Sequence, residues 1–173
     1  VAGTTTSVNT LNVTTQTPGY TNLGKYKASG QPMFSAYLNA SDVDATGDGT
    51  NYTLGGVTAL TELYDIGSNF NTNGTFTAPA TGIYDLRAQV TLTGCTIATT
   101  FVISIVATSR SIIKTFIKAA GSQDESVDVS ALVDMTATDT AHVTIAVSGE
   151  AGDTVDILGA ASAQSFFCGR LVA

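Results

Sequence analysis

The sequence predicts an all-β fold, a sandwich or barrel of short strands. Three observations lead to this class. Apolar and polar residues alternate with period two over most of the chain after residue 32, and clusters of Gly, Asn, Asp and Ser separate the alternating runs. No segment combines a helical period with capping residues. Many short strands joined by turn residues are typical of sandwiches and barrels.

The individual strands follow from the same alternation. The run 83–92 is the clearest, because apolar side chains alternate there with Asp85, Arg87 and Gln89. The run 101–107 is apolar on both faces, which predicts a central strand. Alternation predicts further strands over 33–38, 112–118, 127–135, 141–147, 154–158 and 165–172. Turn-forming clusters separate them at 46–49, 67–69, 71–74, 121–122 and 149–153.

Composition excludes several classes of function. The 173 residues are 43% hydrophobic and 12% charged, which is too apolar for a disordered chain. Seven basic side chains against fourteen acidic ones give a net charge of −7, so nucleic acid is not an expected partner. One His and two distant Cys exclude a four-ligand structural zinc site. No apolar run approaches the roughly 20 residues of a membrane helix, so no membrane insertion is expected.

The chain divides into a short arm, residues 1–31, and one domain, residues 32–173. The arm holds eight Thr and few large apolar side chains, so it cannot bury much surface by itself. We interpret it as an extended arm or the end of a stalk, with a frayed terminus as the alternative.

Four motifs occur in order along the domain. Phe34-Ser35-Ala36 opens it, and residues 74–84 read G-x-F-x-x-P-x-x-G-x-Y. Gly152-Asp153-Thr154-Val155 precedes a late strand, and residues 165–172, which read S-F-F-C-G-R-L-V, are similar to an ending of the type S-F-x-G-x-L. Together these motifs resemble the complement C1q and tumour necrosis factor-like superfamily. The segments 46–52 and 143–149 look most like phage and bacterial versions, such as those of phage virion fibre or decoration proteins.

The resemblance implies a ten-strand jelly roll that assembles as a compact homotrimer. Aromatic and aliphatic side chains that face outward in one copy would then line the threefold axis. A strand that is apolar on both faces, such as 101–107, agrees with this expectation.

The residues of the longest motif predict a structural role. Pro79 fixes φ and Gly82 permits a positive φ, so together they turn the chain sharply between two strands. Phe76 and Tyr84 flank this corner, and their rings can fill the interior while the Tyr84 hydroxyl finds a partner at the edge.

The last strand repeats this structural pattern. Phe167 and Leu171 point the same way along it, and Gly169 between them leaves room for a neighbouring ring or backbone. None of these residues offers reactive chemistry, so we interpret them as scaffold.

No catalytic arrangement is evident, and we expect no enzyme. His142 is the only histidine, it faces away from Val143, and no Ser or Cys lies at a suggestive offset. Asp128 and Asp134 share one face of a strand, which a solvated face explains better than paired catalytic carboxylates.

No cofactor or metal is expected either. Residues 42–49 place oxygen ligands at alternate positions with Gly at the sixth, like a calcium loop. The twelfth position is Thr53, so the bidentate carboxylate is absent and a polar turn is the favoured interpretation, with calcium as the alternative. Cys95 and Cys168 are consistent with a disulfide or with two buried thiols.

We therefore interpret the chain as a non-enzymatic, trimeric head of a virion or extracellular appendage, such as a tail-fibre tip, head fibre or decoration protein. The arm would join it to a stalk or particle, and loops 40–51, 67–74 and 119–125 would contact a host-surface glycan or protein. The alternatives are a cap or glue protein without a receptor, a secreted bacterial adhesion module and, least favoured, a polysaccharide-degrading enzyme. The candidate binding residues are Asp48, Asn51, Tyr52, Asn69 and Asn71.

Overall fold

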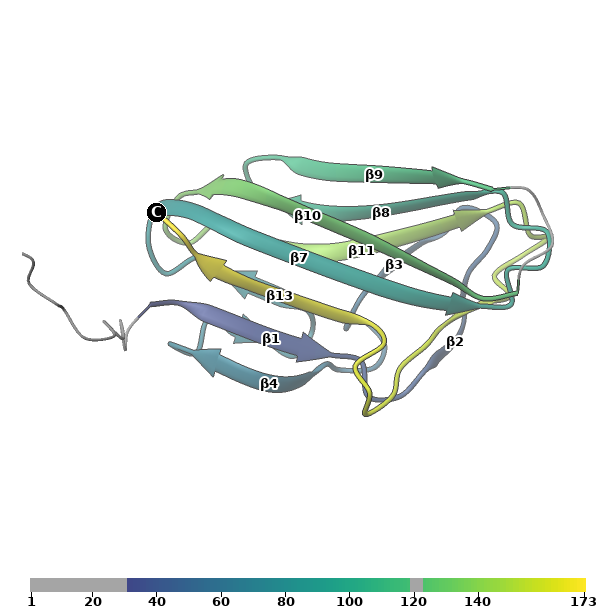
Figure 1. Ribbon diagram of the computed structural model, residues 1–173, viewed down its shortest axis with the longest axis horizontal. Coiled ribbons are helices and arrows are strands. Elements are labelled where there is room, and N and C mark those ends of the chain that lie inside the picture. Colours follow the sequence, from purple (N-terminus) through teal and green to yellow (C-terminus); the bar gives the residue numbers. More distant parts are fainter. Residues whose placement is uncertain (1–30, 119–122) are drawn as a thin grey trace, which may run out of the picture.

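The computed structural model describes residues 31–118 and 123–173, which contain thirteen strands and no helix (Figure 1). The predicted arm therefore lies outside the described residues, except for Gln31, whose side-chain amide donates to the Leu171 carbonyl. The strands are β1 (Met33–Tyr37), β2 (Asp42–Thr46), β3 (Asn51–Thr53), β4 (Thr61–Ile66), β5 (Phe70–Asn71), β6 (Thr75–Thr77), β7 (Gly82–Thr93), β8 (Thr100–Ala107), β9 (Ser111–Ile117), β10 (Glu125–Met135), β11 (Thr140–Ser148), β12 (Val155–Ile157) and β13 (Phe166–Leu171).

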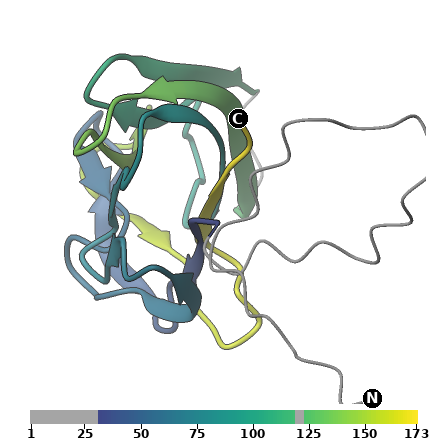
Figure 2. The ribbon, with the colours of Figure 1, turned by 90° about the vertical axis from the view of Figure 1, so that its left-hand side faces the viewer.

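The strands form two antiparallel sheets that enclose one core. Sheet A has the order β2-β12-β7-β13-β1-β4, with β10 on the other edge of β7, and sheet B has the order β5-β6-β11-β8-β9, with β3 beside β11. Seen end-on in Figure 2, the strands surround the interior that the core side chains occupy. The all-β sandwich predicted from the sequence is confirmed.

Every predicted strand is present, with ends that differ by at most two residues. The described residues divide into more strands than the ten that the resemblance implies, because β3, β5, β6 and β12 have three residues or fewer. The prediction missed the five strands β2 to β6, and the two longest of these, β2 and β4, are irregular. Asp44 in β2 has a φ of 52°, and β4 contains a bulge where its pairing with β1 shifts after Ser35.

A stack of aromatic rings joins the two sheets. Phe34 of sheet A lies between Phe70 and Phe76 of sheet B, with ring centroids 4.8 and 4.7 Å away and nearly parallel planes. Phe167 of sheet A meets Phe34 edge-on at 4.9 Å. Such ring pairs add about 0.5–1.5 kcal/mol each beyond the area they bury.

Gly169 makes room for this stack. It lies beside Phe34 and Leu86 in the sheet register and shares their inward-facing side. A Cβ atom at Gly169 would come within 2.5 Å of Leu86 Cδ2 and 2.8 Å of Phe34 Cε1. Phe167 is buried and Leu171 packs against the core, so the predicted pattern of the last strand is confirmed.

The predicted corner at residues 79–82 is present, but Gly82 serves a different purpose there. Phe76 and Tyr84 are buried, and the Tyr84 hydroxyl donates to the Ala80 carbonyl at 2.7 Å, as expected. Gly82 does not adopt a positive φ, contrary to the prediction. It is required because a Cβ atom would lie 2.5 Å from the Ala173 carbonyl oxygen.

Ion pairs link β9 and β10, the edge strands of the two sheets. The carboxylates of Asp128 and Asp134 lie on a solvated face, as predicted, and each also has a basic partner. This ladder consists of Arg110–Asp134 at 3.0 Å, Lys114–Asp128 at 3.1 Å and Lys118–Glu125 at 2.9 Å.

The packing around Gly169 leads to a stability prediction. We expect Gly169→Ala to lower the free energy of unfolding by about 1–3 kcal/mol, because the new methyl group overpacks the aromatic stack. Chemical denaturation with the slope held common measures the change. Gly152→Ala is the matched control, since a Cβ atom there meets nothing within 4 Å. Equal stability of the two variants would contradict the packing role of Gly169.

Candidate functional site

The outer face of sheet A carries more apolar side chains than an ordinary solvent-exposed sheet face. The register of β4, β1, β13 and β7 aligns their outward side chains in rows across this face. Many of these side chains are apolar or aromatic, although the face has no covering layer in the described residues. They are Met33, Tyr37, Tyr64, Ile66, Ile83, Phe166 and Cys168.

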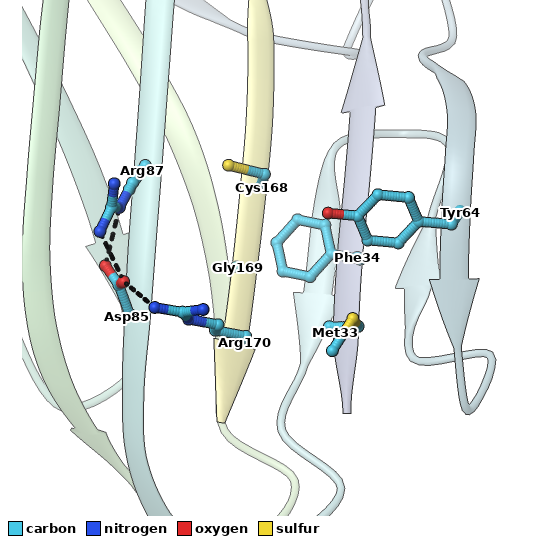
Figure 3. A pocket seen from close by; sticks show the side chains of 8 residues that line it. All are labelled: Met33, Phe34, Tyr64, Asp85, Arg87, Cys168, Gly169 and Arg170. Carbon is cyan, nitrogen blue, oxygen red and sulfur yellow. Dashed lines mark hydrogen bonds and ion pairs between the residues drawn. The ribbon is translucent and has the colours of Figure 1, made fainter. Parts of the chain in front are cut away.

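A hollow of about 270 Å³ lies on this face (Figure 3). One side of it is apolar, with Met33 of β1, Tyr64 of β4 and Cys168 of β13. The other side is charged and contains the set Asp85, Arg87 and Arg170. The hollow therefore suits a group that combines an apolar part with a charge.

The charged side of the hollow has more positive than negative groups. Arg87 donates to the Asp85 carboxylate from Nε at 3.0 Å and from a terminal nitrogen at 2.8 Å. These bonds from Arg87 lower the pKa of Asp85 and raise the pKa of Arg87. Arg170 lies 3.6 Å from the same carboxylate. Two guanidinium groups thus share one carboxylate, and the cluster attracts anions.

The hollow does not present the groups of nucleophilic catalysis. Burial raises the pKa of the Cys168 thiol, so the thiol stays protonated at neutral pH. No histidine lines the hollow. The arrangement can bind an anionic group or a protein surface, and its lining residues supply no nucleophile with an adjacent base.

His142 lies on the opposite side of the sandwich. It is on the outward face of β11 in sheet B, opposite Val106 of β8, while Val143 is buried. The prediction that His142 and Val143 lie on opposite faces of the strand is therefore confirmed. Desolvation lowers the pKa of its imidazole.

The candidate binding residues do not gather at one end. Residues 47–50 contact residues 149–154. Residues 94–99, which follow the end of β7 at Thr93, contact the same region. We call these three segments the distal loops. Loop 67–74 instead follows β4, whose last residue, Ile66, pairs with Met33 at the other end of sheet A. The expectation that loops 40–51 and 67–74 share one end is wrong, and most of loop 119–125 lies outside the described residues.

Four of the five candidate residues keep side chains at or near the surface. Asp48, Asn51 and Asn71 are exposed and Asn69 is half-buried. Asp48 accepts hydrogen bonds from the Thr50 hydroxyl and backbone, which lower its pKa. Tyr52 is only 4% exposed, so its assignment to a ligand-contacting loop is wrong.

Tyr52 takes part in a buried hydrogen-bond network with Asp42, which is the first residue of the calcium-like segment. Its hydroxyl donates to the Asp42 carboxylate, which also accepts from Thr58. Burial, followed by this bond to Asp42, raises the pKa of Tyr52. Because residues 42–46 form a strand, the oxygens of 42–49 do not converge as in a calcium loop. The described residues contain no cluster of three His, Cys, Asp or Glu that could hold a metal ion.

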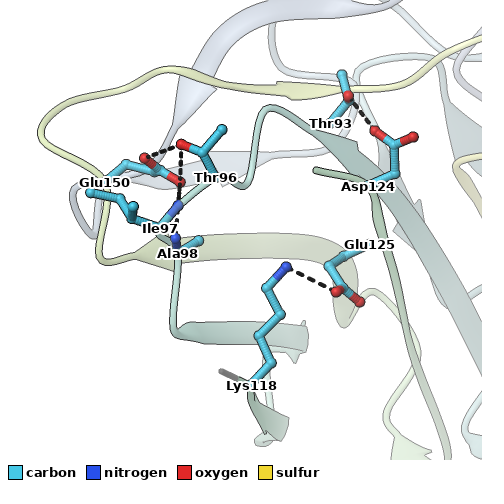
Figure 4. A network of polar contacts seen from close by, with 8 residues as sticks. All are labelled: Thr93, Thr96, Ile97, Ala98, Lys118, Asp124, Glu125 and Glu150. Atoms are coloured by element: carbon cyan, nitrogen blue, oxygen red, sulfur yellow. Dashed lines mark hydrogen bonds and ion pairs between the residues drawn. The ribbon is translucent and has the colours of Figure 1, made fainter. Parts of the chain in front are cut away.

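The distal loops are held by a carboxylate (Figure 4). Glu150 accepts hydrogen bonds from the backbone amides of Ile97 and Ala98 at 2.8 and 2.9 Å and from the Thr96 hydroxyl at 3.2 Å. Because one side chain satisfies three donors of the facing loop, these loops present a defined surface.

The two cysteines are free thiols. Cys95 lies in the distal loops with its side chain buried, and burial raises its pKa to about 11. Cys168 lies on the outer face of sheet A.

Sequence reasoning missed the hollow because its members are spread over four strands far apart in the chain. The alternation of 83–92 predicts that Asp85 and Arg87 share one face of their strand. It likewise predicts that Cys168 and Arg170, two residues apart, share one face of the last strand. The missing information was which strands pair, since only the register brings Arg170 beside Asp85.

Comparison with solved structures supports the fold. The globular domain of zebrafish complement 1qA protein matches with a TM-score of 0.55 at 13% identity, over 83% of this chain and 98% of that domain. Murine APRIL matches at pH 8.5 with a TM-score of 0.52 at 17% identity and at pH 5.0 with 0.51 at 14%, each over 82% of this chain and 99% of APRIL. The fold is thus a C1q/TNF-like jelly roll, as the motifs implied.

No protein-family model and no curated protein matches the chain. Within residues 31–118 and 123–173, no helix is long and apolar enough to cross a membrane.

The lowered pKa of His142 leads to a prediction on pH. The folded state favours the neutral imidazole, so the unfolded state binds the proton more readily below the ordinary pKa of 6.5. The free energy of unfolding should therefore decrease as the pH is lowered from about 7.5 to about 5.5, and this decrease should be smaller in His142→Gln. Denaturation of both proteins at the two pH values isolates the histidine, because the carboxylates are common to both. Identical pH dependence would contradict the assignment.

Proposed function

We propose that the chain is a non-enzymatic, trimeric binding head, carried by a virion or another extracellular appendage. The observation that carries the proposal is the outer face of sheet A, where Tyr64 and Ile66 are 49% and 37% exposed. An antiparallel sheet with one face in water normally places polar side chains there. Covering this face by further copies explains its composition.

A second apolar surface supports a ring of copies. Ile113 and Ile117 of β9 are 62% and 81% exposed, and Leu132 of β10 is 68% exposed. Leu132 pairs with Asp85 and so belongs to the outer face of sheet A, whereas Ile113 and Ile117 lie on the outward side of sheet B, and we call these two isoleucines the edge patch. A closed threefold ring needs two different surfaces on each copy, one of which contacts the other on the next copy. The outer face of sheet A and the edge patch meet this requirement.

The position of the chain's entry indicates which end contacts a ligand. The described chain enters sheet A at Met33, at the end opposite the distal loops. If residues 1–31 join the domain to a stalk or particle, the distal loops point away from it. These loops carry Asp48, Glu150 and Asp153, so a neutral or basic group on a host-surface glycan or protein suits them better than an anionic capsule.

A receptor-free cap or glue protein of a particle is the second candidate. Such a protein would form the same trimer, and the identity of the residues in its loops would not affect its function. A secreted bacterial adhesion module would use the same surfaces as the first proposal, and its carrier would be a cell surface.

The trimer is testable with a single substitution. Light scattering at micromolar concentration should give about three times 17.7 kDa for the wild type. We expect Tyr64→Asp to give the monomer mass, because it places a charge on the covered face. Thr77→Asp, at an exposed position of β6 in sheet B, is the matched control and should stay trimeric. A monomeric wild type, or a trimeric Tyr64→Asp, would count against the proposed assembly.

Paired alanine substitutions at the two ends of the domain distinguish a receptor-binding head from a receptor-free cap. Asp48→Ala with Asn51→Ala tests the distal end, and Asn69→Ala with Asn71→Ala tests the opposite end. We expect binding to intact cells or a glycan array to fall at least about tenfold for the distal pair alone, because truncating central contact residues costs about 2 kcal/mol or more. Unchanged binding for both pairs would reject receptor binding at these loops and favour the cap.

A further inference from the structure

We propose that a second hollow, at the corner where β7 begins and β10 ends, binds the segment Lys25-Tyr26-Lys27 of the same chain. We call it the corner hollow. The inference goes beyond the proposed function, because it concerns one copy and holds whether or not copies assemble. It follows from the lining of the hollow, the place where the chain enters the domain and the charge of residues 1–30.

The corner hollow combines apolar side chains with a single carboxylate. Its volume is about 260 Å³, and its lining includes Ile83 and Met135, the carboxylate of Asp134 and the hydroxyl groups of Thr81 and Ser109. Ile83 is 40% exposed, so a large apolar side chain meets solvent there. In the described part of the chain, Asp134 is the only ionisable residue that lines this hollow. A cavity of about 150 Å³ already holds benzene, so the corner hollow has room for one aromatic ring.

The chain enters the domain beside this hollow, because β1 and β7 both begin at the end of the sandwich where β10 ends (Figure 1). Continuing the register of β1 with β13 places Gln31 opposite Val172. The Val172 amide donates to the Ile83 carbonyl at 2.8 Å, and Ile83 pairs with Asp134. These residues form one row across neighbouring strands, which spans roughly 14 Å at about 4.8 Å per strand.

The chain that precedes the described residues is long enough to reach the hollow. An extended chain covers at most about 3.3–3.6 Å per residue, so the stretch from Gln31 back to Lys27 covers roughly 14 Å. Lys27 and Tyr26 can therefore reach the far end of the row. Because this tether is short, the effective concentration of the segment at the hollow reaches about the millimolar range. Contacts that are weak between separate molecules are then sufficient for docking.

The charges of the segment and of the hollow are complementary. Lys25 and Lys27 are the only charged residues before residue 31, whereas the rest of the chain has five basic side chains against fourteen acidic ones. Asp134 and Arg110 form a pair with side chains 67% and 59% exposed, so water screens it and Asp134 can take a second cation. The Asp139 carboxylate accepts from a backbone amide of the lining and adds a further negative charge.

Tyr26 supplies the apolar part of the segment. In an extended segment it points to one side, and the lysines next to it point to the other. With the Tyr26 ring against Ile83, the flexible stems of the lysines bring their ammonium groups to Asp134 and keep them in water. The Tyr26 hydroxyl then meets the hydroxyl groups of Thr81 and Ser109. Docking of this segment fixes the direction in which residues 1–24 leave the domain.

Proteolysis of the full chain tests the docking, because trypsin cleaves after Lys25 and Lys27. We expect these bonds to be cleaved more slowly than in a synthetic peptide of residues 20–30. Cleavage should be about two- to fivefold faster in Asp134→Asn than in the wild type, which is the effect of one solvent-screened ion pair. Asp128→Asn is the matched control and should behave like the wild type. Asp128 also points outward from β10 and pairs with a lysine, but it lies roughly 20 Å along the strand.

Nuclear magnetic resonance of the isoleucine methyl groups tests the ring contact. The ring current of Tyr26 should shift the methyl signals of Ile83, and Tyr26→Leu should remove this shift. Tyr20→Leu is the control, since it removes a tyrosine ring from the same arm and should leave the signals unchanged. The free energy of unfolding of each variant establishes that the domain stays folded.

Four outcomes overturn the inference. The first is a wild type that is cleaved as fast as the free peptide, and the second is equal cleavage of Asp134→Asn and Asp128→Asn. The third is an Ile83 signal that Tyr26→Leu leaves unchanged. The fourth is protection that disappears when the sample is diluted to monomers, which assigns the contact to a neighbouring copy. The mass of the assembly is measured separately, so the proposed function stands or falls by its own test.

Discussion

The fold depends on how closely Phe34 can approach the last strand. Its ring is stacked between Phe70 and Phe76 of the facing sheet, and this position exists because Gly169 has no side chain. The same rings fix the spacing between the sheets, because sheet A supplies Phe34 and Phe167 and the facing sheet B supplies the other two. The corner at Pro79 and the hydrogen bond of the Tyr84 hydroxyl then hold the end of β7 against this stack.

The sequence was sufficient for the architecture and insufficient for the site. Alternation identified the long strands because their inward side chains are uniformly apolar. It failed in β2 and β4, where the positive φ of Asp44 and the bulge opposite Ser35 and Ala36 interrupt the period. Tyr52 was named as a candidate binding residue, but its side chain is buried and its hydroxyl donates to the Asp42 carboxylate. Local patterns cannot reveal such partners.

The distribution of charge explains how an acidic domain can associate with copies of itself. Asp85, Asp128 and Asp134 lie on the outer face of sheet A and each has a basic partner, while Glu150 is tied into a loop. The basic side chains of the domain lie in two places, the hollow and the ladder between β9 and β10. Attraction between copies is therefore confined to few positions, so their relative orientation is restricted.

The ladder between β9 and β10 has a consequence for handling and folding. Both strands lie at the edge of a sheet, and exposed edges are the places where β-proteins pair into fibres. The ammonium groups of Lys114 and Lys118 lie over the rings of Phe116 and Phe101, at 4.6 and 5.1 Å from the ring centroids, and each also pairs with a carboxylate of β10. Charged lysines at an edge oppose the docking of another strand. The ladder thus opposes edge-to-edge pairing between copies that are held close together.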